Sequence, residues 1–254
     1  MNRLEICKNC NYKLDKQYCS NCGQKNVEVL ELKIIIKDFF KDVFELDSRV
    51  FLTLKYLLFK PGFLTKEYWL GKRKRYISPM RLIIITSFIY FIMVPFLFDE
   101  SETFFYKDDQ PTANQKKVYL EAIDARLKTM VISLEKYATL IATPFLTFIL
   151  SWLYRNRGLL YLHHIIVWLH FCSFEYCLHT VSSAFMLLFE TYSDLIDIIS
   201  IIPLIVYLII MMKNLYEDSY AKTIVKAFIV LSSFILFAIS VLVGYVFIPT
   251  LFLI

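Results

Sequence analysis

Long apolar runs separated by short polar stretches make up most of the chain after residue 78. A helix needs about 20 mostly apolar residues, and at least about 17, to cross a bilayer. Five runs approach or exceed this length, and they cover about residues 80–98, 135–154, 159–189, 195–212 and 225–250. The pattern therefore predicts a mainly α-helical protein, a polytopic transmembrane bundle of about five spans over residues 79–254.

Residues 27–78 have a different pattern, because charged residues interrupt every apolar run. Apolar residues between Leu32 and Phe44 recur every three or four positions, which indicates a helix with one greasy stripe. Such a segment can lie on the bilayer surface or dock on neighbouring helices, and we expect residues 27–78 to form an amphipathic, interfacial segment. Pro61-Gly62 interrupts the segment, and we expect a shorter helix with Tyr68 and Trp69 after it.

Residues 1–26 are polar and contain two Cys-x-x-Cys pairs, Cys7/Cys10 and Cys19/Cys22. Four thiolates complete a tetrahedral zinc shell, so the sequence predicts a small zinc ribbon with one structural Zn²⁺. Because no coordination position stays open, this ion is expected to be structural rather than catalytic. A redox pair, an iron site or unmetallated thiols remain as alternatives.

The composition supports a membrane protein, since 57% of the 254 residues are hydrophobic and soluble domains average about 45–50%. The net charge is +5, and its placement gives the orientation. Five cations lie at the N-terminal end of the first span: Lys72, Arg73, Lys74, Arg75 and Arg81. We read this patch as a topology signal that also contacts anionic headgroups. Its closeness to the bilayer argues against nucleic acid.

The same charge pattern predicts a multi-pass protein of the cell (inner) membrane, with the N-terminus in the cytoplasm and the C-terminus outside. Cytoplasmic thiols stay reduced, which favours metal over disulfides for the four clustered cysteines.

The third predicted span carries an unusual number of ionisable residues. At about 100° per residue, His164, Glu175 and His179 share one face of the helix, and His170 lies with His163 on another. These groups either hydrogen-bond neighbouring helices or form a site that acts on protons, metals or solutes. We take His164, His170, Glu175 and His179 as a candidate intramembrane polar site. The sequence contains no hydrolase motif and no Gly-rich phosphate loop.

Several short motifs together resemble a known family. They are the ribbon ending "CGQ" at 22–24, "LD" at 46–47, "PG" at 61–62, "GKRKRY" at 71–76 and "PMR" at 79–81. With the looser match "HHIIVWLHFCSF" at 163–174, the chain is similar to a bacterial membrane family catalogued as domain of unknown function 3667. The resemblance implies an N-terminal zinc ribbon ligated by Cys7, Cys10, Cys19 and Cys22, several spanning helices and no established activity. Asn11 follows the first knuckle where glycine is more usual.

We therefore expect a non-enzymatic membrane module whose ribbon docks a cytoplasmic protein or steadies an assembly. A transporter or channel component that uses the third span is the first alternative. An intramembrane metal-dependent enzyme is the second.

Overall fold

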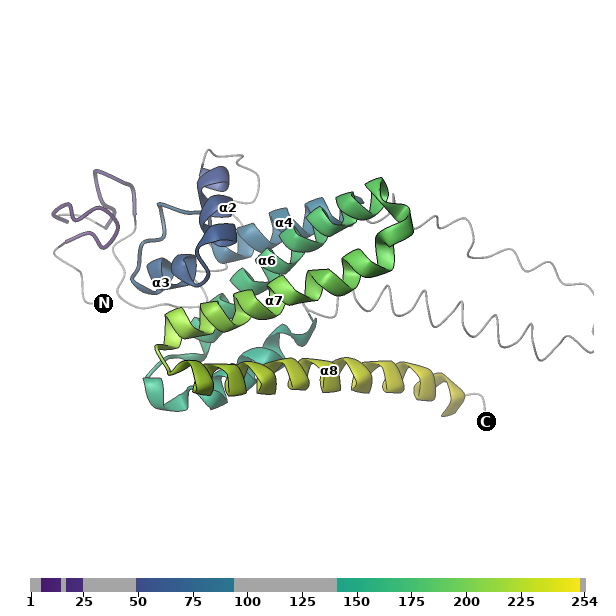
Figure 1. Ribbon diagram of the computed structural model, residues 1–254. Coiled ribbons are helices and arrows are strands. Elements are labelled where there is room, and N and C mark those ends of the chain that lie inside the picture. Colours follow the sequence, from purple (N-terminus) through teal and green to yellow (C-terminus); the bar gives the residue numbers. More distant parts are fainter. Residues whose placement is uncertain (1–5, 15–16, 25–48, 94–140, 252–254) are drawn as a thin grey trace, which may run out of the picture.

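The computed structural model describes residues 6–14, 17–24, 49–93 and 141–251 (Figure 1). Its helices are α2 (Arg49–Phe59), α3 (Phe63–Trp69), α4 (Pro79–Met93), an unlabelled helix Ile141–Leu153, α6 (Tyr161–Leu188), α7 (Ser193–Tyr216) and α8 (Tyr220–Leu251). Short 3-10 turns, η3 (Arg155–Arg157) and η4 (Glu190–Tyr192), precede α6 and α7. The prediction of a mainly α-helical protein is confirmed. The greasy stripe between residues 32 and 44 lies outside the described residues.

Three helices in the described part of the chain are long and apolar enough to cross a membrane: α6, α7 and the Tyr220–Val241 part of α8. They coincide with the third, fourth and fifth predicted spans. By the 1.5 Å rise per residue, the 28 residues of α6 extend about 42 Å. The shorter apolar helices α4 and Ile141–Leu153 fall within the first two predicted spans. Residues 94–98 and 135–140 of those spans lie outside the described residues, so five crossings stay a prediction.

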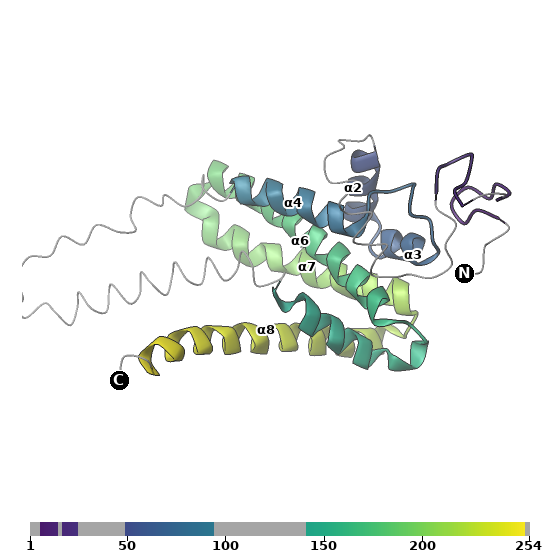
Figure 2. The same cartoon turned by 180° about the vertical axis from the view of Figure 1, so that it is seen from behind.

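The long helices pack as a bundle in which α6 lies between α4 and α7, and α7 also packs against α8. Seen from behind, the helix Ile141–Leu153 lies beside α8 (Figure 2). Phe145 stacks on Phe237 of α8 across this contact, with ring centroids 5.3 Å apart. Many apolar side chains on α7 and α8 stay exposed, as expected for helices that face lipid.

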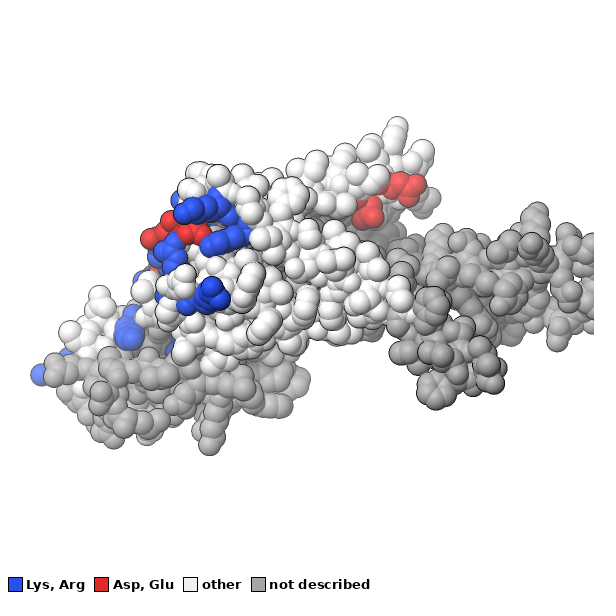
Figure 3. Space-filling view, turned by 90° about the horizontal axis from the view of Figure 1, so that it is seen from below, with Lys and Arg blue, Asp and Glu red and all other residues white. Residues whose placement is uncertain are grey.

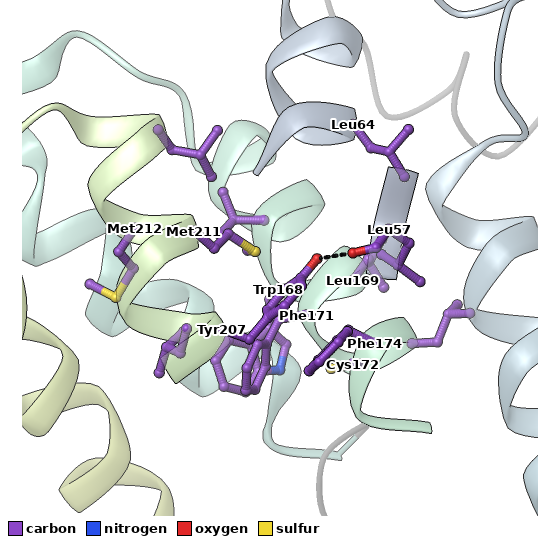
Figure 4. Close-up of a cluster of buried hydrophobic side chains, with 14 of the residues drawn as sticks. Leu57, Leu64, Trp168, Leu169, Phe171, Cys172, Phe174, Tyr207, Met211 and Met212 are labelled. Carbon is purple, nitrogen blue, oxygen red and sulfur yellow. Dashed lines mark hydrogen bonds between the residues drawn. The ribbon is translucent and has the colours of Figure 1, made fainter. Parts of the chain in front are cut away.

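The short helices α2 and α3 dock on the bundle. Gly62 separates them and has a left-handed backbone with φ of 83°, a conformation that glycine adopts without strain. The Tyr207 hydroxyl of α7 donates to the carbonyl of Leu57 on α2 at 2.9 Å (Figure 4). The Asn214 amide donates to the carbonyl of Pro61. Residues 49–69 therefore pack against α6 and α7.

Aromatic and sulfur-containing side chains fill the space between α2, α6 and α7. The ring of Phe174 stacks on Tyr207 with centroids 3.6 Å apart. Figure 4 shows the cluster, which includes Leu57, Leu64, Trp168, Leu169, Phe171, Cys172, Phe174, Tyr207, Met211 and Met212. This packing explains why the third span is buried along much of its length.

Charged side chains are distributed unevenly along the bundle. Figure 3 shows lysines and arginines gathered at one end of the described residues, with a small acidic group towards the other end. The basic end also carries α3 and the cysteine-rich ribbon, whereas the end of α8 lies at the opposite end (Figure 1). The charge asymmetry predicted from the sequence is therefore present along the bundle axis.

Candidate metal centre

The four N-terminal cysteines converge on one point. All four Sγ atoms lie within 4.8 Å of one another. The Cys7–Cys22 and Cys10–Cys19 sulfurs are each 3.6 Å apart. Cys7 and Cys19 are buried, whereas Cys10 and Cys22 are partly exposed. The four cysteines could therefore bind one metal ion.

Two matching turns hold the sulfurs in place. In the first knuckle the Asn11 N–H donates to the Cys7 carbonyl, and the Cys7 N–H donates to the Tyr12 carbonyl. Gly23, Cys19 and Gln24 repeat this pattern in the second knuckle, and all four bonds are 2.8 Å long. Asn11 has φ of 58° and Gly23 has φ of 71°. Asparagine is one of the few residues besides glycine that tolerates this region, so Asn11 can stand where glycine is more usual.

The thiols differ in their electrostatic surroundings. Burial raises the pKa of Cys7 to about 12. A hydrogen bond from the Tyr12 backbone is the main cause that lowers the pKa of Cys10 to about 7. A bound cation would hold all four groups as thiolates, because metal ligation requires the deprotonated form. Around a tetrahedral ion four cysteine ligands would complete the shell and leave no open position for a substrate.

Gln24 attaches the ribbon to the helical body. Its side-chain amide donates from Nε2 to the carbonyl of Gly71 at 2.6 Å and accepts at Oε1 from the N–H of Arg73 at 3.1 Å. Lys8 packs over the same turn, since a Cβ added at Gly71 would lie 2.9 Å from Lys8 Cδ. We call this pair of contacts the Gln24 clasp. It links the metal centre to residues 72–75, the basic segment that follows α3.

The cations at the N-terminal end of α4 differ in exposure and in the partners of their side chains. Lys74 and Arg75 are exposed, whereas Lys72 forms a salt bridge with Glu67 at 2.7 Å. Arg73 lies over the ring of Tyr68. Arg81 differs from the predicted surface patch, because its side chain is only 2% exposed in the first turn of α4.

The polar residues of α6 point to different neighbours. His164 Nδ1 and the Tyr216 hydroxyl of α7 are hydrogen-bonded at 2.7 Å. His170 Nδ1 and the Thr65 hydroxyl of α3 are hydrogen-bonded at 2.8 Å. The His179 ring lies 5.8 Å from the ring of Tyr90 on α4. These partners come from three elements, as expected for residues that join helices.

Within the described residues, the four cysteines are the one group of three or more metal-ligating side chains close enough to share an ion. His164, His170, Glu175 and His179 do not form such a group. The described part of α6 therefore lends no support to a second metal centre.

Sequence reasoning missed the partners Thr65, Tyr216 and Gln24. A threonine in a short amphipathic helix and a tyrosine near a helix end carry no local sign of a distant histidine. The "CGQ" motif at 22–24 was a signal for Gln24, but its role became visible only with the turn at 71–73.

A family model described as a protein of unknown function (DUF3667) matches residues 47–91. No curated protein and no solved structure matches the chain. The matched stretch includes α2, α3, the basic segment and most of α4, so it contains the turn that receives the Gln24 clasp. The resemblance predicted from the sequence motifs is thereby confirmed: residues 47–91 carry the pattern of the DUF3667 family.

Proposed function

We propose that this protein is a multi-pass membrane module whose ribbon holds one structural zinc ion at the cytoplasmic face and docks a partner protein or steadies an assembly. The observation that carries the proposal is the two-sided ribbon. The Gln24 clasp fastens one side, while Ile6, Tyr12 and Tyr18 are 58%, 50% and 52% exposed. Exposed aromatic residues on a rigid unit are typical of protein-binding surfaces.

Zinc is the metal that the donor set favours. A tetrahedral shell with Zn–S bonds of about 2.3 Å places its sulfurs about 3.8 Å apart. Two of the sulfur pairs, Cys7–Cys22 and Cys10–Cys19, are 3.6 Å apart and approach this spacing. Thiolate ligands also favour zinc over calcium or magnesium, which prefer oxygen.

The charge asymmetry supports a cytoplasmic ribbon. Lysines and arginines close to membrane helices are retained on the cytoplasmic side. The end of the bundle that carries the basic segment is also the end that carries the ribbon (Figures 1 and 3). In this orientation the ribbon projects into the compartment where its thiols stay reduced.

The test compares the full-length protein with a Tyr12→Ser/Tyr18→Ser double variant. Tyr192→Ser is the matched control, because Tyr192 is equally exposed but belongs to η4. Crosslinking mass spectrometry on intact membranes, starting from Lys8 and Lys13, should identify a protein crosslinked to the wild type and to the control. The double variant should lose that crosslink and keep one zinc per chain by elemental analysis. Identical crosslinks in all three proteins would refute docking through this surface.

A transporter or channel component is the second candidate, and one observation favours it. The Tyr154 hydroxyl and His164 Nε2 are both buried and have no hydrogen-bond partner within the described residues. Both residues pack on Tyr216, whose ring stacks on Tyr154 with centroids 3.5 Å apart. Buried polar groups of this kind often contact internal water or a passing solute. pH-dependent ion flux in proteoliposomes that is lost in His164→Gln would support this role, and no flux at any pH would remove it.

A further inference from the structure

Arg81 is a buried cation whose guanidinium has no partner among the described residues. It lies in the first turn of α4 and is 2% exposed. Its Nε has no hydrogen-bond acceptor, and its guanidinium forms no ion pair with any described residue. A buried charge without a counter-charge is strongly unfavourable, so an anion bound to the Arg81 guanidinium would stabilise the protein.

The position of Arg81 at the N-terminal end of α4 makes its unpaired positive charge more unfavourable. The N-terminal end of a helix carries a partial positive charge, so a cation in the first turn is repelled there and an anion is attracted. The backbone N–H of Arg81 donates to the Ser78 hydroxyl at 3.4 Å. Two more donors in this stretch, Arg73 Nε and the Tyr76 hydroxyl, are buried without partners among the described residues. The stretch from 73 to 81 therefore has donors in excess of acceptors.

The face of α4 that carries Arg81 continues as an apolar stripe. Ile85, Phe88 and Ile92 follow Arg81 at helical spacings of four, three and four residues, so they lie on the same face. Phe88 is 64% exposed and Ile92 is 49% exposed. This stripe begins at the basic end of the bundle and follows α4, which packs along the candidate membrane span α6. Arg81 is at its headgroup end.

We propose that Arg81 and the Ile85/Phe88/Ile92 stripe form a binding site for an anionic phospholipid. The guanidinium binds the phosphate, for which its paired N–H groups are suited, and one acyl chain lies on the stripe. Binding requires the terminal side-chain bonds of Arg81 to rotate, because its guanidinium is buried in this structure and must reach the phosphate. The nearby exposed cations Lys74 and Arg75 favour a headgroup with net negative charge. This site is independent of the ribbon and of what the ribbon docks.

The test uses the full-length protein in a phosphate-free maltoside detergent, titrated with short-chain phosphatidylglycerol while the thermal unfolding midpoint is followed. The lipid should raise the midpoint of the wild type. Arg81→Gln should weaken the apparent affinity by about tenfold or more, the effect of losing a charge-assisted hydrogen bond. Lys74→Gln removes the same charge from an exposed position and should weaken the apparent affinity for the lipid by less than about twofold. Equal affinity in the two variants would overturn the proposal.

Further experiments distinguish binding of the lipid from binding of free phosphate and control for variants that do not fold. Phe88→Ser should weaken lipid binding, whereas Phe148→Ser should not, although Phe148 is 61% exposed on the helix Ile141–Leu153. Glycerol 3-phosphate at the same concentration should leave the midpoint unchanged; a rise equal to that with lipid would overturn the acyl part of the site. If Arg81→Gln does not fold, Arg81→Lys replaces it, with the same expected weakening. A wild type that does not respond to the lipid refutes the site without any variant.

Discussion

Thr65 on α3 and His170 on α6 share a hydrogen bond of 2.8 Å between Oγ1 and Nδ1, and both side chains are buried. The bond joins a short helix at the basic end of the bundle to the first half of a candidate membrane span. It gives the buried imidazole a polar partner in an otherwise apolar core. It also explains why a polar residue is accommodated inside this span.

Replacing Thr65 with valine should destabilise the protein by about 1–3 kcal/mol, because valine keeps the shape of threonine but leaves His170 Nδ1 without a partner. Thermal unfolding in detergent measures the change. Thr180→Val is the control, since the Thr180 hydroxyl bonds only to the carbonyl of Tyr176 in its own helix. Equal unfolding midpoints for the two variants would show that the Thr65–His170 bond contributes little.

Gln24→Ala should release the ribbon from the turn at 71–73 while leaving the metal centre intact. The Arg73 N–H loses its side-chain acceptor and keeps only the Gly71 carbonyl at 3.1 Å, so it should exchange with solvent several-fold faster, as expected for a lost hydrogen bond of about 1 kcal/mol. Hydrogen–deuterium exchange of the 70–76 peptide measures this. Gln17→Ala, at an exposed ribbon position, should leave the exchange unchanged. Unchanged exchange in Gln24→Ala would contradict the clasp.

Gly62→Ala should destabilise the protein more than Gly158→Ala does. Both glycines have positive φ, so alanine costs each about 1–2 kcal/mol of backbone strain. An added Cβ at Gly62 would also lie 3.2 Å from the carbonyl oxygen of Met211 and from Leu215 Cγ, whereas Gly158 has open space. Unfolding midpoints of the two variants give the difference, and its absence would mean that α3 can shift away from α7.

Metal removal should loosen the ribbon and leave the helices unchanged. A unit of about 20 residues cannot build a core of its own, so the ion supplies most of its folding free energy. After chelation, limited proteolysis should cut within residues 6–24, while the helical circular dichroism stays the same. A ribbon that resists protease without metal would show that the clasp alone keeps it folded.

Asp218→Asn tests a cluster of charges at the turn between α7 and α8. The Asp218 carboxylate accepts from Lys226 at 2.7 Å and also pairs with Arg157. The Lys226 hydrogen bond is the main cause that lowers the pKa of Asp218 below its ordinary value of 3.8. A lowered pKa stabilises the fold above pH 3.8, and this stabilisation is lost as the pH falls through the folded-state pKa.

The variant should therefore be less stable than wild type by about 2 kcal/mol at pH 7, and the difference should shrink at pH 3 and below. Glu217→Gln is the control, because Glu217 and its partner Lys66 are both exposed and their pair contributes little. A difference that is the same at both pH values would contradict this account of Asp218.

Features encoded by local sequence were predictable. The four cysteines come together because of their spacing within two turns, and Asn11 and Gly23 mark the positions of positive φ. The third span was predicted at 159–189 and is found as Tyr161–Leu188, because hydrophobicity sets its length.

Features that depend on contacts between distant segments were not predictable. His164 and His170 were placed on separate stripes of one helix, but their partners Tyr216 and Thr65 come from elements 52 and 105 residues away in sequence. Arg81 was grouped with exposed cations because it adjoins them in sequence. Only the packing around the start of α4 buries it.

The Gln24 clasp touches only main-chain atoms, the carbonyl of Gly71 and the N–H of Arg73. It therefore recognises the shape of the backbone and is indifferent to the side chains that this stretch carries. The side chains of the cations at 72–75 take no part in the clasp, so exchanging them removes neither of its two hydrogen bonds. Among these contacts, Gly71 is the position where a side chain is excluded, by its φ of 86° and by Lys8 above it.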